Sequence, residues 1–258
     1  MDLGLSGRAC IVTGASRGIG RATAIALARE GASVLVIGRD EEALRAACPD
    51  ADVLALDITE PDAGERVRDE CQQRFGRIDA LVNNAGTSEV KPLDQLTDED
   101  WQVQWDLHVM GPMRLMRAIA PAMAERGSGR IVNVCSSSGK RPSGTNMAYS
   151  VTKAAELSLS RAFADQYAGQ GVLINAVAPG PVGSELWMAP GGMADQAAEV
   201  QGKTREEVLE STASRIPLGR FGTEEEIAAV IVFLCSGRAS NVAGAAWSVD
   251  GGSVPVII

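Results

Sequence analysis

The sequence predicts an α/β protein with a doubly wound parallel sheet of seven strands and helices on both faces. Short apolar runs of strand length alternate with longer runs of helical composition along the chain. Strands that are joined in this way by helices pair in parallel and are covered on both faces. A glycine-rich turn at residues 14–20 joins the first apolar run to the first helical run. Polar residues follow several predicted strands, at the edge where such sheets bind ligands.

The composition indicates one domain that spans residues 1–258. Hydrophobic residues make up 45% of the chain, and there is no repeat, low-complexity tract or linker. The formal net charge of -9 disfavours nucleic acid and anionic membrane surfaces as partners. The longest apolar run, residues 227–235, is too short to span a bilayer, and the first ten residues contain no apolar signal region. We therefore expect a cytoplasmic protein.

Cysteine and histidine usage excludes two further classes. The five cysteines lie far apart without a Cys-x-x-Cys pair, and the chain has one histidine. Because zinc sites and disulfide frameworks need closely spaced sets of these residues, we expect neither a metal site nor disulfides.

The first strand, turn and helix predict a phosphate-binding site. Residues 8–13 are an apolar run of strand length, and residues 21–30 are rich in Ala, Ile and Leu and end at a glycine. Gly14 permits a tight turn, whereas Gly18 and Gly20 permit close approach of a ligand and of the helix to the sheet. N–H groups at the helix N-terminus can then bind a pyrophosphate. The alternative is a purely structural turn.

The remaining elements follow the same alternation. Charged, amphipathic residues predict the helix at 60–75, and Thr223 is a typical N-cap for the last helix. Gly111 and Pro112 predict a bend within the long helix before the fifth strand. The predicted strands are 33–37, 53–56, 79–83, 130–135, 173–177 and 246–249; the predicted helices are a short one after Asp40, then 60–75, 98–125, 148–168, a helical excursion at 185–214, and 223–235.

Polar residues gather at one edge of the predicted sheet. The glycine turn, Asp57, Asn83 and Ser136 all lie where strands end. Ligands of doubly wound sheets bind outside the carboxyl ends of the strands, so these residues predict one active site. Cys135 points away from Ser136 on an alternating strand and is expected in the core.

Tyr149 and Lys153 indicate acid–base chemistry. They are four residues apart in a predicted helix, so their side chains lie on one face. A nearby ammonium group favours the phenolate and lowers a tyrosine pKa from about 10 toward the working pH. Such a tyrosine can give or take a proton, and the Ser136 hydroxyl can hold the substrate oxygen. Ser137 and Ser138 are alternatives to Ser136, and a lone Tyr-x-x-x-Lys spacing also occurs on solvated helix faces.

Six motifs, in their order and spacing, resemble those of a known family. They are Thr13-Gly-Ala-Ser-Arg-Gly-Ile-Gly20, Asn83-Asn-Ala-Gly86, Ser136 thirteen residues before Tyr149, Tyr149-x-x-x-Lys153, Pro179-Gly180 and Val249-Asp-Gly-Gly252. The chain thereby resembles the short-chain dehydrogenase/reductase family, and most closely its single-domain ketoreductase or 3-oxoacyl-(acyl-carrier-protein) reductase-like branch. The resemblance covers nearly the whole chain. It implies a Rossmann-like fold, an NAD(P) cofactor, a small carbonyl or alcohol substrate, and a homotetramer or homodimer.

The resemblance also implies residue roles. Tyr149 would exchange the proton with the substrate, Lys153 would lower the Tyr149 pKa and hold the nicotinamide ribose, and Ser136 would bond the substrate carbonyl. Asp57 is expected at the adenine, and Asn83 at the adenosine side of the cleft unless it only stabilises the sheet. The cofactor-binding residues are expected to be Gly14, Ser16, Arg17, Gly18, Ile19, Gly20, Arg39, Asp57, Ile58, Asn84, Ala85, Gly86, Tyr149, Lys153, Pro179, Gly180, Val182 and Ser184.

The end of the second strand favours NADP(H) over NAD(H). An NAD enzyme of this architecture places an acidic side chain there to bond the ribose 2′-hydroxyl, but this chain has Gly38 followed by Arg39. A guanidinium group can meet a 2′-phosphate, and Arg17 can add a second cation. The alternative is that Arg39 faces solvent and Asp40 is its partner or a helix N-cap.

His108 occupies a place where many relatives have an asparagine, counted from Trp101 to Gly111. In the family this asparagine helps to hold a water that links the lysine to bulk solvent. Imidazole can also bond water and backbone, so His108 is predicted to replace it behind Lys153, in the neutral form. The alternative is a packing histidine bonded to a backbone carbonyl.

Residues 185–214 predict a mobile substrate lid, with Trp187 facing the substrate. The alternative for this segment is a subunit contact. As a whole, the chain predicts a hydride-transferring oxidoreductase for carbonyl and secondary-alcohol substrates. The alternatives are a catalytically weak nucleotide-binding regulator, an NAD-dependent alcohol dehydrogenase, and a sugar-nucleotide epimerase or dehydratase, for which the short C-terminus leaves little room.

Overall fold

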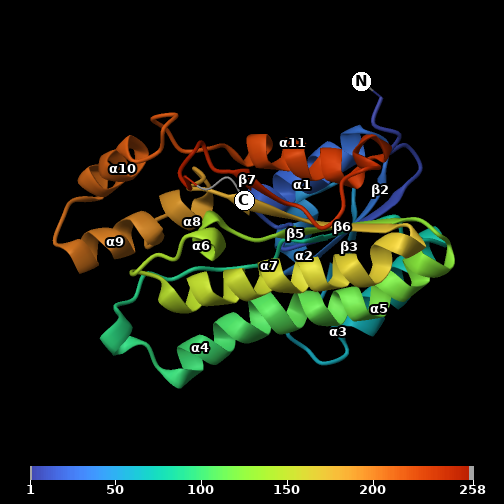
Figure 1. The fold of residues 1–258 in the computed structure, drawn as a ribbon, viewed down its shortest axis with the longest axis horizontal. Helices are drawn as coiled ribbons and strands as arrows, with labels where there is room; N and C mark the ends of the chain where they lie inside the picture. Colours follow the sequence, from blue (N-terminus) through green and yellow to red (C-terminus); the bar gives the residue numbers. More distant parts are fainter. Residues whose placement is uncertain (1, 256–258) are drawn as a thin grey trace.

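The computed structural model describes residues 2–255 and contains the predicted parallel sheet (Figure 1). Its seven strands lie in the order β3-β2-β1-β4-β5-β6-β7, and every neighbouring pair is parallel. The order reverses between β1 and β4, which is where a doubly wound sheet opens a crevice for ligands. The strands are β1 Ala9–Thr13, β2 Ser33–Gly38, β3 Asp52–Ala55, β4 Ala80–Asn83, β5 Gly129–Val134, β6 Val172–Pro179 and β7 Ala246–Val249.

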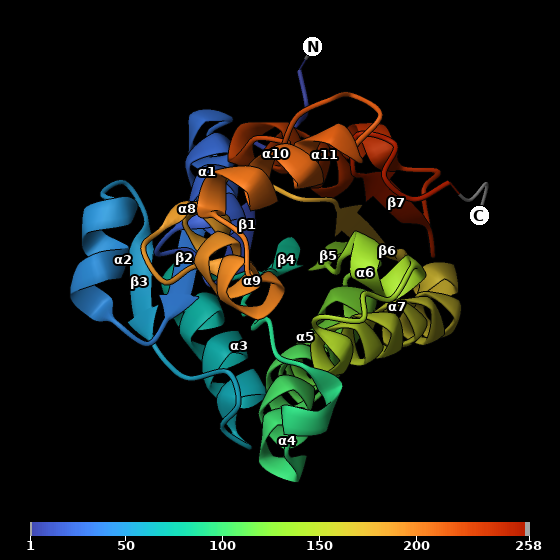
Figure 2. The same ribbon diagram turned by 90° about the vertical axis from the view of Figure 1, so that its left-hand side faces the viewer.

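Helices cover both faces of the sheet, with α1 and α11 on one face and α3, α5 and α7 on the other (Figure 2). Within residues 2–255, no helix is both long enough and apolar enough to cross a membrane. The α-helices are α1 Gly18–Arg29, α2 Glu41–Ala47, α3 Ala63–Phe75, α4 Asp98–Trp105, α5 Gly111–Glu125, α6 Ser137–Lys140, α7 Met147–Tyr167, α8 Glu185–Met188, α9 Met193–Gln201, α10 Arg205–Ser214 and α11 Glu224–Cys235. Short 3₁₀ turns are η1 Leu93–Gln95, η3 Ala168–Gln170 and η4 Gly237–Ala239, and η2 Asp106–Met110 is a π-helix.

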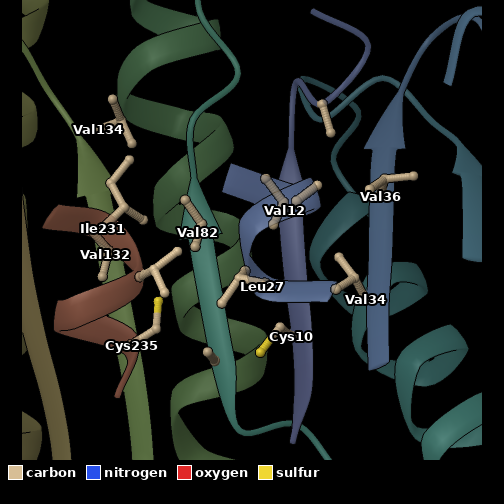
Figure 3. Packing of buried hydrophobic residues seen from close by; sticks show 14 of the residues in the cluster. Cys10, Val12, Leu27, Val34, Val36, Val82, Val132, Val134, Ile231 and Cys235 are labelled. Carbon is tan, nitrogen blue, oxygen red and sulfur yellow. The ribbon is translucent and has the colours of Figure 1, made fainter. Parts of the chain in front are cut away.

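Strand alternation sends side chains into two cores. Cys10 and Val12 of β1 pack with Leu27 of α1 and Ile231 of α11 on one face (Figure 3). Ala9 and Ile11 of the same strand point to the opposite core, against α3 and α5. Each fully buried Val, Leu or Ile contributes about 1.5–3 kcal/mol, so both faces hold the strands firmly and fix the positions of their carboxyl ends.

The long helix predicted at 98–125 contains a π-helical segment instead of a simple bend at Gly111. The Gly111 N–H bonds the Asp106 carbonyl, five residues earlier, and Pro112 has no N–H with which to restore the α-helical pattern. The predicted excursion at 185–214 is resolved into α8, α9 and α10. Thr223 caps α11 as predicted, through a capping box with Glu226.

Candidate active site

A cavity of about 560 Å³ lies at the carboxyl edge of the sheet. Its wall is formed by the glycine turn, the carboxyl ends of β2, β3, β4, β5 and β6, and the helices α4, η2, α7 and α8. Among the predicted site residues, all except Gly20, Asn83 and His108 line it: Gly14, Ser16, Arg17, Gly18, Ile19, Arg39, Asp57, Ile58, Asn84, Ala85, Gly86, Ser136, Tyr149, Lys153, Pro179, Gly180, Val182, Ser184 and Trp187.

The glycine turn has the geometry of an anion-binding site. Gly14 and Gly18 adopt φ values of 65° and 63°, which only glycine adopts without strain. A side chain at Gly14 would meet the Ala85 Cα at 2.7 Å, and one at Gly20 would overlap the Gly14 carbonyl oxygen. The N-terminus of α1 has no side-chain cap, so its N–H groups are available to a phosphate.

A hydrogen-bond clamp joins the turn to the segment after β4. The Thr13 hydroxyl oxygen accepts the N–H groups of Asn84, at 2.9 Å, and of Ala85, at 3.0 Å. The Asn84 amide nitrogen donates back to the carbonyls of Thr13 and Gly14. These hydrogen bonds fix the position of the glycine turn relative to the segment after β4, and both line the cavity.

The outer wall is positively charged where β2 ends. Asp40 caps α2 by accepting the Ala43 N–H at 3.0 Å and makes no ion pair with Arg39. Arg39 is exposed, lines the cavity and has no ion pair within residues 2–255. Arg17 lies 3.9 Å from Glu185.

Asp57 forms a local turn at the end of β3. Its Oδ1 accepts both the N–H and the hydroxyl of Thr59, at 2.9 Å and 2.8 Å. The turn fixes the carboxylate at the cavity wall and leaves Oδ2 available to a ligand.

Ser136 is the N-cap of α6, and this fixes the orientation of its side chain. Its Oγ accepts the Ser138 N–H at 3.0 Å, so the hydroxyl proton can be donated to a ligand. Gly139 lets α6 approach α7 closely, because a side chain there would meet the Lys153 carbonyl at 2.8 Å. Ser136 is therefore held on the same wall as Tyr149 and Lys153.

Lys153 is buried behind Tyr149, and its Nζ lies 5.8 Å from the centre of the phenol ring. The ammonium donates to the Val134 carbonyl at 2.9 Å and to Glu156 Oε2 at 2.7 Å. Burial lowers the pKa of Lys153, but Glu156 and then Tyr149 more than offset this, and the pKa lies above its ordinary value. The lysine is thus charged at neutral pH.

His108 lies in the π-helix behind the Tyr149 ring. The two rings meet edge to face, with their centres 5.3 Å apart. Nε2 accepts the Thr87 N–H at 3.3 Å, so the proton of the neutral ring is on Nδ1 and is donated to the Thr152 hydroxyl at 3.2 Å. Burial, followed by the Lys153 charge, holds the His108 pKa well below its ordinary range. The ring is neutral, as expected, but no hydrogen bond joins it to Lys153 within the described chain.

Asn83 and Cys135 are buried residues of the sheet edge, and Cys135 also belongs to the cavity wall. The Asn83 amide donates to Asn133 Oδ1 at 2.8 Å between β4 and β5, so it stabilises the sheet and does not line the cavity. The neighbouring Asn84 does line it. Burial raises the pKa of the Cys135 thiol well above its ordinary value, which agrees with a core cysteine rather than a nucleophile.

The segment after β6 reaches across the cavity to the far wall. Trp187 lines the cavity and packs edge to face on Phe221, with ring centres 5.3 Å apart. Gln196 of α9 accepts the Val90 N–H at 2.9 Å, and Val90 packs against Met193 and its neighbours. The segment is therefore joined to the loop after β4 by a hydrogen bond and by apolar packing.

Sequence reasoning missed Thr59, Thr87 and Glu156. Thr59 stands two residues after Asp57, a spacing that favours a local turn and gave a usable signal. Glu156 stands three residues after Lys153, a spacing that places both side chains on one face of a helix, so it also gave a usable signal. Thr87 gave none, because its partner His108 comes into reach only once the helices are packed.

These features define a class of protein. A glycine turn, an uncapped helix N-terminus and a Ser-Tyr-Lys group in one cavity are the parts of a dinucleotide-dependent oxidoreductase of the doubly wound type.

Similarity to known proteins identifies the family. Residues 14–253 match the family model described as Enoyl-(Acyl carrier protein) reductase. The 3-oxoacyl-(acyl-carrier-protein) reductase FabG of Thermotoga maritima is 35% identical, over 97% of this chain and 99% of that protein. Sorbitol dehydrogenase of Cereibacter sphaeroides is 34% identical, over 96% and 98%. L-sorbose reductase of Gluconobacter frateurii, complexed with NADPH and L-sorbose, has a TM-score of 0.91 at 34% identity, with both chains fully covered.

The chain belongs to the short-chain dehydrogenase/reductase family and is an oxidoreductase.

Proposed function

We propose that this protein transfers a hydride between NADP(H) and a carbonyl or secondary-alcohol substrate, with Tyr149 as general acid or base. The observation that carries the proposal is that Ser136, Tyr149 and Lys153 line the same cavity as the glycine turn. A regulator without catalysis would have no use for a buried, charged lysine behind a cavity tyrosine.

The residues of the cavity fit a nicotinamide dinucleotide. A side chain at Gly18 would have one neighbour, Glu224 Oε1 at 3.9 Å, so a ligand can approach this backbone, and the free N–H groups of α1 can bind the pyrophosphate. Asp57 and Asn84 would face the adenosine part, whereas Gly180 and Ser184 line the other side of the cavity. When bound, the nicotinamide supplies or accepts the hydride.

Each side chain then has a separate task. The Ser136 hydroxyl donates a hydrogen bond to the substrate oxygen, since its own acceptor position is used by the Ser138 N–H. Tyr149 gives its phenolic proton to that oxygen in reduction and removes it in oxidation. The Lys153 ammonium stabilises the phenolate through the low-dielectric interior.

The proposed preference for NADP(H) rests on Arg39. Its guanidinium group forms no ion pair within residues 2–255 and lines the cavity beyond the end of β2, and the last residue of that strand is Gly38 rather than an acidic residue. A 2′-phosphate supplies the negatively charged partner that this guanidinium group lacks. Gluconobacter L-sorbose reductase is described with NADPH and the putative gluconate 5-dehydrogenase of Beutenbergia cavernae with NADP, which supports the same choice.

The substrate class is best tested with a panel. The relatives are named for ketoses, polyols and acyl thioesters, so the panel contains one ketose, one polyol, one 3-oxoacyl thioester and one simple cyclic ketone. Oxidation of NADPH and NADH, and the reverse reaction on the alcohols, are followed at 340 nm. Turnover with NADPH on at least one carbonyl supports the proposal. Equal or faster turnover with NADH contradicts the cofactor preference, and cofactor binding without any turnover contradicts the activity.

We also propose a homotetramer or homodimer. Trp105 of α4, Val151 of α7 and Trp247 of β7 are large apolar side chains that remain 36–43% exposed in the single chain. Patches of this kind are typical of subunit contacts. Light scattering that gives the mass of one chain contradicts the proposal.

A further inference from the structure

Glu156 is a buried acid that the catalytic group of Ser136, Tyr149 and Lys153 does not explain. It lies one turn after Lys153 on α7, and the two side chains are 2% and 4% exposed. Its Oε2 accepts a hydrogen bond from Lys153 Nζ at 2.7 Å. A leucine would fill the same space without the cost of burying a charge, which amounts to several kcal/mol for an unpaired ion.

The ammonium of Lys153 has three N–H groups, and two of them are already bonded. One points to the Val134 carbonyl at the end of β5 and one to Glu156, so both are held from behind. The third is left for the cavity that Lys153 lines beside Tyr149. Glu156 therefore fixes the direction in which the lysine acts.

The surroundings of this pair contain few other titratable groups. The Cys135 thiol, at the end of β5, lies beside the Glu156 carboxylate. Tyr149 faces Lys153 from the same helix, and neutral His108 faces it from the π-helix. Among residues 2–255, Glu156 is the one carboxylate that forms an ion pair with Lys153.

We infer that Glu156 is a positioning residue that keeps the Lys153 ammonium protonated and directed toward Tyr149, and so sets the upper pH limit of the reaction. The reaction in question is the one under "Proposed function", on which this inference rests. Burial alone disfavours the ammonium form of a lysine. The carboxylate reverses this, in agreement with the raised Lys153 pKa.

The direct test reads the protonation of Lys153 in the cofactor-free protein. The chain has four lysines, Lys91, Lys140, Lys153 and Lys203, so a protein labelled at the lysine ¹³Cε gives few NMR signals, and Lys153→Arg assigns the one of interest. The parent signal is expected to titrate above the ordinary lysine range. In Glu156→Gln, which keeps the shape but removes the charge, the pKa of Lys153 is expected to fall by about one pH unit or more. An unchanged or higher pKa overturns the inference.

Two variants control this test. Ser160→Ala alters a buried polar side chain one turn further along α7 that has no hydrogen-bond partner, and it is expected to leave the Lys153 titration unchanged. Glu156→Asp retains the charge and is expected to keep most of the parent pKa. If Glu156→Gln does not fold, Lys153→Met is added to it. Recovery of folding in the double variant supports the inference, whereas no recovery contradicts it.

The kinetic test is the dependence of kcat on pH. For Glu156→Gln, kcat is expected to stay near the parent value at the acidic end and to fall as pH rises through the lowered pKa of Lys153. A loss of the same factor at every pH indicates a structural role only and overturns the inference. Because the NMR titration needs neither cofactor nor substrate, it stands even if the proposed activity is not found.

Discussion

At the scale of single residues, Tyr149 is the most decisive position. Tyr149→Phe keeps the ring that packs edge to face on His108 but removes the phenolic proton that the proposed function assigns to exchange with the substrate. We expect kcat to fall by about 10²–10⁴-fold, while the dissociation constant of NADPH, measured by fluorescence, stays unchanged. A variant that retains more than half of the parent kcat refutes the assignment.

Arg39 carries the proposed preference for NADP(H). Arg39→Ala removes a guanidinium group that makes no ion pair within residues 2–255, so no other contact is broken. We expect kcat/KM for NADPH to fall by about tenfold or more, the value of one charge-assisted hydrogen bond, with little change for NADH. Arg45→Ala is a matched control, because this arginine on α2 pairs with Glu41 instead. Equal losses with both cofactors argue against a 2′-phosphate contact.

At the scale of elements, the π-helix η2 determines where His108 lies. The extra residue in this turn turns the ring toward Thr87 and Thr152, and the Thr152 hydroxyl donates to the Tyr149 carbonyl. Asparagine can also accept the Thr87 N–H, whereas leucine leaves it unbonded. We expect His108→Asn to keep substantial activity and His108→Leu to lose most of it, with the melting temperature and NADPH affinity measured in parallel. If His108→Leu turns over like the parent, the His108 side chain has only a packing role.

The segment from α8 to α10 is proposed as the substrate lid. Trp187 lines the cavity from α8. The hydrogen bond from the Val90 N–H to Gln196 joins the segment to the loop after β4. Loss of the indole removes apolar contact worth about one tenfold step in affinity. Trp187→Ala is therefore expected to raise the substrate KM by about tenfold and to leave the cofactor KM unchanged. Leu93→Ala serves as the control, because this exposed side chain on η1 does not line the cavity. If neither KM moves, Trp187 does not contact the substrate.

The elements show what the sequence could predict and what it could not. The glycine turn and the Tyr149–Lys153 pair depend on spacing within one strand, turn or helix, so the sequence shows them directly. The sheet order follows from alternation because parallel strands need helical connections. The π-helix and the hydrogen bond from the Thr87 N–H to His108 depend on how α4, α5 and α7 pack. Neither gives a periodic signal, because both arise from tertiary contacts.

At the scale of the whole molecule, Asp79 connects several elements at the amino end of the sheet, which is opposite the cavity. This buried carboxylate accepts the Ala9 N–H of β1 at 2.9 Å and pairs with Arg8, Arg77 and Arg126. Burial acts to raise the pKa of Asp79, but Arg77, the Ala9 N–H and Arg8 outweigh it, and the pKa lies below its ordinary value. The residue therefore connects β1, β4 and the end of α5 through one charge.

A depressed pKa in the folded state has a definite consequence for acid stability. The stabilisation is fully present above the unfolded-state pKa, near 4, and is lost as pH falls through the folded-state value. We expect Asp79→Asn to lower the free energy of unfolding at pH 7 by about 1–3 kcal/mol, because the arginine partners are partly exposed. The difference in the free energy of unfolding between variant and parent narrows below about pH 4, where Asp79 of the unfolded parent takes up its proton. Urea unfolding of both proteins at pH 7 and pH 3 measures this, and NADPH affinity at pH 7 is expected to be unchanged, since the cavity lies at the other end of the strands. A gap that is as large at pH 3 as at pH 7 means that shape, and not the Asp79 charge, stabilises this end of the sheet.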